Sequence, residues 1–352
     1  RLYTVRDKQT DMFPDLAKWQ QNSLIDCARL AKLYTLSFPE LDNFAGKNDN
    51  ALDAYWAAML HVEKCALSVT DMLAIFAQYW QNVPSELVAQ KTTETELMPL
   101  ASCKMLIQNQ EWYWAIDRLD HLESRLNSLL ASSAGGQVKY DRQTKHLLTH
   151  PATPETAAHP VTLYFSARSP YSYLGLELAV KLCSHYGCQL IVKPVLPMMM
   201  RGMNVPQTKK MYIFHDTKRE AKKHGIDYGF VADPLGKAVK NCYALFALAK
   251  SQGKEISYLL EFARAVNSQG LLADNENGMQ VIVQRSGLNW HEAKRELNNP
   301  VQPWRQEVED NMNELNNLGL WGVPCFHYQD TVTWGQDRLW VIEQAILSKK
   351  KA

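Results

Sequence analysis

The sequence predicts an α/β fold that is interrupted by a block of helices and preceded by a mostly helical region. Three observations support this prediction. Short β-rich runs stand on both sides of a helical stretch at residues 216–310. A stretch rich in Gly, Ser, Thr and Pro, at 131–160, separates the first third of the chain from the rest. A set of residues around Trp114 recurs 220 positions later, around Trp334.

The first third of the chain is expected to be mostly α-helical. Apolar residues recur at helical spacing within 15–130, including a long stretch at 55–79. Domains commonly have about 100 to 200 residues, so this chain of 352 is long enough for two or three. We therefore expect a degenerate, mostly helical domain at 1–130, a linker at 131–160 and a second domain at 161–347.

The second domain is expected to open with a βαβ unit. Residues 161–165 (VTLYF) and 189–195 (QLIVKPV) are β-rich, and 173–186 has the apolar pattern of a helix. A strand, a helix and a second strand in this order are typical of two parallel strands joined by a crossover.

A helical insertion at about 205–315 is expected to follow. After it, the domain closes with strands at 325–328 and 331–334 and a helix at 336–347. Strands on the two sides of the insertion must therefore pair across it. The helices expected within the insertion, each bounded by Gly, Pro, Asn or Ser, are 216–224, 235–251, 256–267, 278–285 and 290–297.

The chain contains an internal repeat, which indicates a divergent tandem duplication, although two unrelated strand-to-helix junctions could also coincide. The first copy is degenerate because Lys104 stands opposite Pro324 and no matching Ser-Pro turn is found within the chain. We expect any chemistry in the second copy and an interface from the first, in an internal pseudo-dimer or a homodimer. The repeated residues are Trp114, Asp117, Arg118, Leu119 and Glu123, which match Trp334, Asp337, Arg338, Leu339 and Glu343.

Charge and hydropathy exclude two classes of partner. The chain has 38 Lys and Arg against 37 Asp and Glu, so its net charge of +1 creates no field that attracts nucleic acid or an anionic membrane. No apolar run approaches the roughly 18 residues of a membrane-spanning helix. We therefore expect no nucleic-acid partner and no membrane association.

The cysteines and histidines indicate neither a disulfide framework nor a metal site. The seven cysteines are irregularly spaced and form no Cys-x-x-Cys pair. The histidines at 215, 224, 291 and 327 lack metal-ligand spacing, so we expect no metal. No signal-peptide pattern follows Arg1. These features favour a reducing compartment, the cytoplasm.

Three segments could carry chemistry, and each also has a purely structural interpretation. The Ser-Pro turn at 169–170 is either a good helix cap or, together with the helix N-terminus, a place for an anion such as a thiolate. The Gly-Val-Pro segment at 322–324 is either an ordinary turn or a cis proline that turns the preceding backbone toward a ligand. Gln336 and Asp337 either cap the last helix or bind a ligand amine.

In this order, the three segments resemble the DsbA-type arrangement of the thioredoxin-like superfamily, a thioredoxin fold with an inserted α-helical domain. The similarity covers about 161–347 and is greatest to 2-hydroxychromene-2-carboxylate isomerases and kappa-class glutathione transferases. The SPYSY turn at 169–173 stands where disulfide oxidoreductases of the superfamily carry Cys-x-x-Cys. The GVP segment at 322–324 is similar to the cis-proline loop, and GQDRL at 335–339 to the closing glutathione-binding motif.

The resemblance implies glutathione as a bound co-substrate. It implies that Ser169 hydrogen-bonds the glutathione sulfur and favours its thiolate. It also implies that the Val323 backbone, ahead of a cis Pro324, pairs with the cysteinyl main chain. Gln336 and Asp337 would hold the γ-glutamyl end, although Gln336 stands where a small hydroxyl residue is common in the family.

The loop after the second strand supplies further candidates. Asn204 resembles another glutathione contact, in a loop whose length departs from the family pattern. Met198 and Met203, with Tyr171 of the Ser-Pro turn, are candidates for an apolar substrate pocket over the sulfur, and core packing is the alternative for the methionines. The basic run at 193–223 attracts an acidic ligand or is a solvated helix face.

The leading hypothesis is a glutathione-dependent isomerase or transferase acting on a small-molecule electrophile. In the isomerase reaction a thiolate adds to a conjugated double bond and departs after rotation about the resulting single bond. One alternative is a DsbA-family thiol–disulfide oxidoreductase, but both motif cysteines are replaced and exchange needs an attacking thiolate. The other is a non-catalytic binding or scaffold protein with an internal pseudo-dimer.

Overall fold

The computed structural model describes residues 2–3, 15–36, 102–107, 111–114, 116–129, 138–139, 141, 148 and 159–349. Cα packing divides the chain into two units. The first comprises Arg1–Thr10 and Ser23–Tyr140, and the second comprises Asp11–Asn22 and Asp141–Ala352. The helix expected at 55–79 and most of the linker expected at 131–160 lie outside the described residues.

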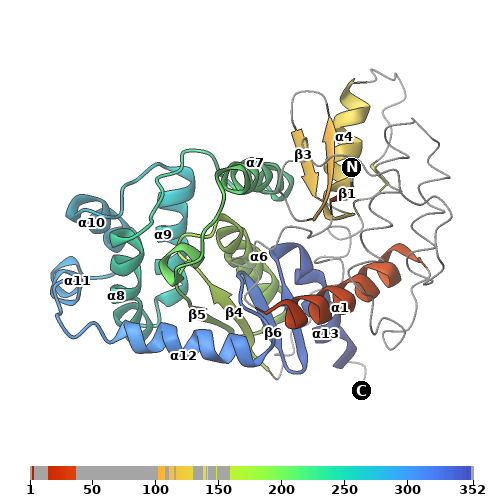
Figure 1. Cartoon of the computed structure of the whole chain (residues 1–352). Helices are drawn as coiled ribbons and strands as arrows, with labels where there is room; N and C mark the ends of the chain where they lie inside the picture. Colours follow the sequence, from red (N-terminus) through yellow and green to blue (C-terminus); the bar gives the residue numbers. More distant parts are fainter. Residues whose placement is uncertain are drawn as a thin grey trace. The chain divides into compact units, whose positions relative to one another are not determined.

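A four-stranded sheet forms the centre of the second unit (Figure 1). Its strands are β4 (Val161–Phe165), β5 (Leu190–Pro194), β6 (Cys325–Tyr328) and β7 (Thr331–Trp334), in the order β5-β4-β6-β7. β4 and β5 are parallel, whereas β6 is antiparallel to both β4 and β7. The strand bounds agree with the sequence prediction to within one residue, and β4 and β6 do pair across the insertion.

Helix α6 (Pro170–Tyr186) joins the two parallel strands. Ser169 caps its start, Pro170 occupies the first helical position, and Gly187 ends it with a φ of 66°. These are the residue types that favour the start and the end of a helix, because Ser satisfies an exposed N–H and Gly tolerates the left-handed conformation. The sequence therefore determines that α6 starts directly after Ser169, the candidate catalytic residue.

Two apolar layers cover the sheet. Alternate residues of β4 belong to different clusters, as the pleat of a strand requires. Leu163 and Phe165 pack in a large core with α6 and α13 (Leu339–Lys349), and Tyr164 packs in a smaller one with residues of α12 (Trp304–Asn317). β4 is therefore buried on both faces, which explains its uninterrupted apolar sequence.

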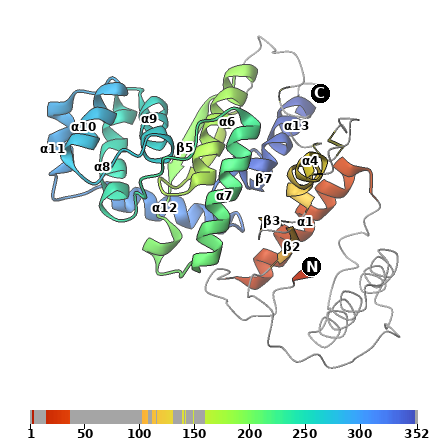
Figure 2. The ribbon, with the colours of Figure 1, turned by 90° about the horizontal axis from the view of Figure 1, so that it is seen from above.

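Six helices lie between β5 and β6, after the short 3-10 helix η4 (Met198–Arg201). Figures 1 and 2 show α8 to α11 grouped on one side of the unit, with α13 on the other. The six helices are α7 (Gln207–His224), α8 (Lys237–Ser251), α9 (Glu255–Ser268), α10 (Glu276–Arg285), α11 (Trp290–Leu297) and α12.

Two helices of the insertion differ from the sequence prediction. Helix α7 begins nine residues before the predicted start at 216, directly after Pro206 and without a side-chain cap. Helix α12 was missed, because its buried apolar residues, Trp304, Val308 and Leu315, are scattered among polar ones. So narrow an apolar stripe does not stand out from a loop in sequence.

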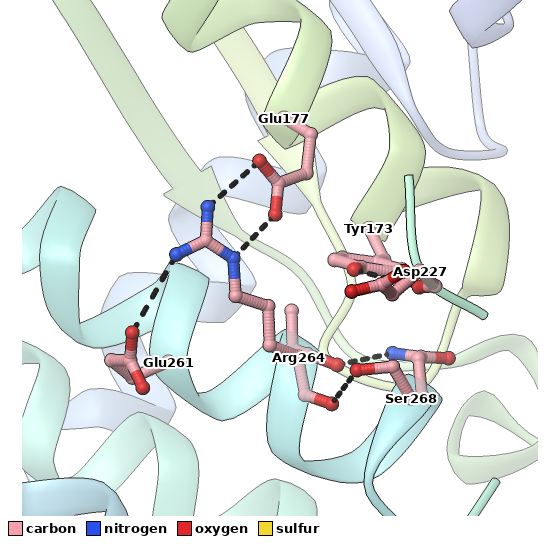
Figure 3. Close-up of polar contacts among 8 residues, drawn as sticks. Tyr173, Glu177, Asp227, Glu261, Arg264 and Ser268 are labelled. Carbon is pink, nitrogen blue, oxygen red and sulfur yellow. Dashed lines mark hydrogen bonds and ion pairs between the residues drawn. The ribbon is translucent and has the colours of Figure 1, made fainter. Parts of the chain in front are cut away.

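An ion pair joins helix α9 of the insertion to α6 (Figure 3). Arg264 of α9 donates to both carboxylate oxygens of Glu177 at 2.6 and 2.9 Å, and the carboxylate of Glu261 lies 3.5 Å from the guanidinium. One turn earlier on α6, the Tyr173 hydroxyl donates to the Asp227 carbonyl at 2.9 Å. Two-point arginine pairs fix geometry as well as distance, so the helix that starts after Ser169 is held on the insertion.

The described part of the first unit ends in a hairpin followed by a helix. β1 (Leu2–Tyr3) pairs with β2 (Ser102–Ile107), which pairs with β3 (Glu111–Trp114), and η3 (Ile116–Arg118) leads into α4 (Leu119–Leu129). Helix α1 (Leu16–Tyr34) contains residues of both units. The prediction of a helical pattern throughout 15–130 is therefore wrong at β2 and β3. The Glu-Trp-Tyr-Trp sequence of β3 is rich in the aromatic residues that favour strands.

The hairpins of the two units correct the proposed alignment of Lys104 with Pro324. β3, η3 and α4 each lie 220 residues before β7, η5 (Gln336–Arg338) and α13. However, Trp114 pairs with Lys104, whereas Trp334 pairs with Cys325. Lys104 therefore matches Cys325, and the preceding residue, a cysteine, matches Pro324. The alignment assumed equal hairpin turns, but the first turn is one residue longer.

Two classes of feature are missing from the described ranges. None of the helices in these ranges combines the length and the apolar sequence that crossing a bilayer requires. Nor do the same ranges contain a group of three or more His, Cys, Asp or Glu placed to hold a metal ion.

Candidate active site

The Ser-Pro turn is built as a helix cap. Ser169 has an extended backbone (φ −81°, ψ 115°), and its Oγ accepts the Ser172 N–H at 3.2 Å. The Ser169 N–H donates to the Ser166 carbonyl at 2.9 Å, which closes the turn. The capping interpretation of Ser169 is therefore confirmed, and any chemical role must coexist with it.

The cap leaves the hydroxyl proton of Ser169 available. Oγ uses a lone pair for the Ser172 N–H, and no acceptor in the part of the chain described by the structure takes its proton. The side chain is half-buried and stands at the positive end of the α6 dipole. A hydroxyl donor at a helix N-terminus favours a thiolate over a thiol, since both the hydrogen bond and the dipole stabilise negative charge.

The Val323–Pro324 peptide bond is cis, as the resemblance implies. Pro324 is buried, whereas Val323 is partly exposed. Over the described ranges, neither the N–H nor the carbonyl of Val323 forms a backbone hydrogen bond. The main chain of Val323 can therefore pair with an extended peptide-like ligand.

The structure brings the three motif-bearing segments into one cluster. Helix α6 lies against the cis-proline loop at Gly175, where an added Cβ would stand 3.2 Å from the Pro324 Cβ. On the other side of this loop, the Gly335 N–H donates to the Pro324 carbonyl at 2.9 Å. Helix α6 also contacts η5. Segments more than 150 residues apart in the sequence thus meet at one end of the sheet.

The turn before η5 requires glycine. Gly335 has a φ of 105°, which side chains other than hydrogen rarely allow, and an added Cβ would stand 2.4 Å from the Asp337 Oδ1. The Asp337 carboxylate therefore folds back over this turn, and it lies 3.6 Å from the Arg338 guanidinium. A ligand amine would share the carboxylate with that arginine.

Gln336 is directed into the protein. Its side-chain amide donates to the Glu220 carboxylate on α7 at 3.4 Å, and both residues are almost fully buried. Asp337, which retains some exposure, is therefore better placed than Gln336 to contact a ligand.

Tyr171 is tied to α7. Its hydroxyl donates at 2.6 Å to the carboxylate of Asp216, which is fully buried and also pairs with Arg219 at 3.0 Å. The Tyr171 ring is half-buried. A role in a substrate pocket would fall to the ring rather than to the hydroxyl.

The methionine loop approaches the Ser-Pro turn, but Asn204 lies on the surface. The Met199 Sδ is 3.0 Å from the guanidinium of Arg168, the residue before Ser169. Met198 and Met203, on either side of Met199, are both half-buried. Asn204 is exposed, and its side chain makes no hydrogen bond within the described residues.

Two arginines lie near the site; Arg168 was not singled out from the sequence, and Arg201 was identified only as part of the basic run at 193–223. Arg168 makes a two-point ion pair with Asp233 at 2.7 and 2.6 Å. Burial raises the pKa of Asp233, but the hydrogen bonds and charge of Arg168 outweigh this and the pKa is lowered. Arg201 donates to the Trp321 carbonyl at 3.0 Å, and burial lowers its pKa. The position of Arg168 directly before Ser169 was a usable signal that the sequence analysis did not use.

Tyr243 of α8 also reaches this end of the sheet. Its hydroxyl donates to the Val195 carbonyl at 2.7 Å and accepts the Ala167 N–H at 3.1 Å. The residue is almost fully buried, and burial raises its pKa. In sequence it is one apolar position of a helix, so nothing distinguished it from a core residue.

Cys325 does not supply a nucleophile. It follows the cis proline, but it is fully buried and its thiol donates to the Gly322 carbonyl at 2.9 Å. Burial raises the pKa of the Cys325 thiol well above its usual range. A thiol in this state carries almost no thiolate at neutral pH, so Cys325 is not an attacking group at this site.

Comparison with known proteins identifies the second unit. The model of the DSBA-like thioredoxin domain matches residues 160–347, more than half of the chain. This match confirms the thioredoxin-like fold with an inserted helical domain that the three motifs predicted.

Individual relatives are more distant. The 2-hydroxychromene-2-carboxylate isomerase of Pseudomonas putida is 23% identical over 194 residues, which cover 53% of this chain and 93% of the relative. The enzyme of the same name from Sphingobium xenophagum is 22% identical over 195 residues, covering 53% of this chain and 97% of the relative. A solved structure of a 2-hydroxychromene-2-carboxylate isomerase aligns with a TM-score of 0.47 and 22% identity, over 54% of this chain and 96% of that one.

Proposed function

Because the chain belongs to the DSBA-like thioredoxin domain family, we propose that it is a glutathione-dependent isomerase or transferase acting on a conjugated electrophile. The observation that carries the proposal is the hydroxyl of Ser169, whose proton no acceptor among the described residues takes and which stands at the N-terminus of α6, where a thiolate would be stabilised. The two curated relatives, both named isomerases, support the same class of reaction.

The residues around Ser169 fit a γ-glutamyl tripeptide. The main chain of Val323, which makes no backbone hydrogen bond within the described ranges, suits the cysteinyl residue, because it offers one N–H and one carbonyl beside the cis Pro324. Asp337 suits the γ-glutamyl amine, since it is a carboxylate with residual exposure. We assign Gln336 to the support of this turn through Glu220, and we keep Asn204 as a peripheral contact.

The chemistry divides between the ligand and the protein. When bound, glutathione would supply the nucleophilic sulfur that adds to the double bond and leaves again. The Ser169 hydroxyl would donate a hydrogen bond to that sulfur. This bond stabilises the thiolate and so lowers the thiol pKa, although serine is not itself ionised. The half-buried Met198 and Met203, with the Tyr171 ring, would offer the electrophile an apolar surface. The buried thiols of Cys183, Cys242 and Cys325 suit a reducing compartment, and we place the protein in the cytoplasm.

The proposal is tested by titrating reduced glutathione into the protein by calorimetry while thiolate absorbance is followed against pH. We expect binding, with a thiol pKa at least about one unit below the free value near 8.5. Ser169→Ala should return the thiol pKa toward the free value while the melting temperature falls only by the loss of one cap. No binding at millimolar glutathione would exclude both the isomerase and the transferase.

Thiol–disulfide exchange is the competing activity of this fold. Ser169 and Ser172 stand at the two motif positions, and Cys325 is buried with a raised pKa, so the site itself has no attacking thiolate. The variant Ser169→Cys places a thiol at the helix N-terminus and should gain exchange activity against a small disulfide. A correctly folded Ser169→Cys protein without exchange activity would contradict the assignment of this turn as the active site.

We further propose that the first unit is a divergent copy of the second that contributes an interface rather than a second site. The repeated order of β3, η3 and α4 supports this. A protein lacking residues 1–130 should lose solubility or activity. Full activity in a soluble, monomeric truncated protein would refute the interface.

A further inference from the structure

The hydroxyl of Tyr243 occupies an unusual place in the sheet. Parallel strands are joined by evenly spaced N–H to carbonyl bonds. Beyond the last paired residues of β4 and β5, the Val195 N–H donates directly to the Phe165 carbonyl at 2.8 Å. The next bond of this ladder would run from the Ala167 N–H to the Val195 carbonyl. The Tyr243 hydroxyl stands between these two groups, at 3.1 and 2.7 Å.

The inserted hydroxyl satisfies both backbone groups while it keeps them apart. The pair is buried, so neither group has water as an alternative partner. A ring contact with Trp304 of α12, at 6.0 Å between centroids, helps to hold the tyrosine in place. The two chain segments therefore separate at the level of Tyr243, and they do so because a helix of the insertion reaches between them.

The segments that separate here are those that carry the site. Ser169 is two residues after Ala167, and Met198 is three residues after Val195. The Ser-Pro turn is held from its other side by the Ser166 N–H, which donates to the Ser172 Oγ at 3.3 Å. The Tyr243 hydroxyl thus bridges the two backbone segments that lead into the cap and into the methionine loop.

We propose that Tyr243 is a positioning residue for Ser169, whose hydroxyl holds the Ser-Pro turn away from the β5–η4 segment and so fixes Ser169 at the thiol site. This inference rests on the proposed function for its chemical meaning. Removing the oxygen leaves the Ala167 N–H and the Val195 carbonyl without this bridge. If they join directly at about 2.9 Å, the turn that carries Ser169 shifts toward the β5–η4 segment; if they do not, the turn loses the contact that fixes it.

The variant Tyr243→Phe tests this proposal, and Tyr258→Phe is its matched control. Tyr258 of α9 is also fully buried, and its hydroxyl donates at 3.0 Å to the Cys242 carbonyl, away from both site segments. With glutathione bound, Tyr243→Phe should raise the thiol pKa by about one unit and lower kcat more than it raises KM. Tyr258→Phe should lower the melting temperature without moving the thiol pKa.

A second readout does not depend on glutathione. In the Ser169→Cys background, the pKa of the new thiol is measured from the pH dependence of alkylation by iodoacetamide, with peptide mapping to separate the exposed Cys27 and the half-buried Cys188. Adding Tyr243→Phe should raise that pKa by about one unit, and adding Tyr258→Phe should not. Equal thiol pKa values in the two double variants would overturn the positioning role. Absence of glutathione binding by the unmodified protein would instead refute the proposed function, while the thiol at 169 would still decide the role of Tyr243.

Discussion

The hairpin and helix that end the described part of the first unit can be compared with those that close the second. β3, η3 and α4 follow one another with the same lengths as β7, η5 and α13. Arg118 and Arg338 are both buried, and each contacts the aspartate before it: Arg118 donates to the Asp117 carbonyl at 3.0 Å, and Arg338 lies 3.6 Å from the Asp337 carboxylate. We call the strand, the 3-10 helix with its Asp-Arg pair and the following helix, which both segments share, the structural frame.

The two segments differ in sequence at the positions that match Gly335 and Pro324. Ala115 stands in sequence where the second segment has Gly335, and a cysteine matches Pro324. Gly335 is the residue whose N–H binds the Pro324 carbonyl. The comparison separates residues that both strand-to-helix junctions share from residues found only beside the proposed site. Gly335 and Pro324 occur only in the second segment, whereas Asp337 has a counterpart, Asp117, in the first.

The largest effect should come from giving the second segment the residue of the first. Gly335→Ala forces a side chain into a backbone conformation (φ 105°, ψ 143°) that costs about 1–3 kcal/mol, and places its Cβ 2.4 Å from the Asp337 Oδ1. We expect the carboxylate to be displaced and glutathione affinity, measured by calorimetry, to fall by more than about 30-fold, which corresponds to about 2 kcal/mol.

The reciprocal variant Ala115→Gly is the matched control. It should leave glutathione affinity unchanged, because the first segment is not expected to bind the ligand. A similar loss of affinity in both variants would mean that both segments contribute to binding, and the first copy would no longer be degenerate.

The motifs and strands of the second unit were predictable because each has a local cause. Ser169 and Pro170 are strong start signals for a helix, and β4 and β6 are short apolar runs. Tyr243 was not predictable, because its role depends on a gap between two backbone segments that sequence spacing does not encode. Lys104 was misaligned for a related reason: one extra residue in a turn shifts a whole strand.

A second, intermediate effect concerns the repeated glutamates. Glu343 is fully buried and accepts the Tyr186 hydroxyl and the Leu148 N–H, the latter at 2.8 Å. Glu123 is partly exposed and accepts the Lys139 N–H at 2.7 Å. Glu343→Gln replaces one of two buried carboxylate oxygens by an amide donor, and a buried polar group without a suitable partner costs about 1–3 kcal/mol, so the variant should lower the free energy of unfolding by about 2 kcal/mol.

Denaturant unfolding of Glu343→Gln beside Glu123→Gln provides the measurement. Glu123→Gln should change the free energy by less than about 0.5 kcal/mol, as expected of a surface group. Equal losses would show that the two glutamates serve the frame to the same degree, and the contrast in burial between α4 and α13 would then have no energetic meaning.

The smallest effect decides the role of Asp337. Its counterpart Asp117 persists in a segment without the glycine and proline, which favours a role in the frame, beside the following arginine. If Asp337 binds the ligand, its substitution must affect binding more than the same substitution of Asp117. A purely structural role in the frame predicts no such difference. Asp337→Asn keeps the size of the side chain and removes the charge that a γ-glutamyl amine would meet. It should weaken glutathione binding about tenfold, or about 1.4 kcal/mol, whereas Asp117→Asn should leave binding unchanged. If both variants lose stability alike and neither changes affinity, Asp337 belongs to the frame, and the amine of the ligand must be bound elsewhere.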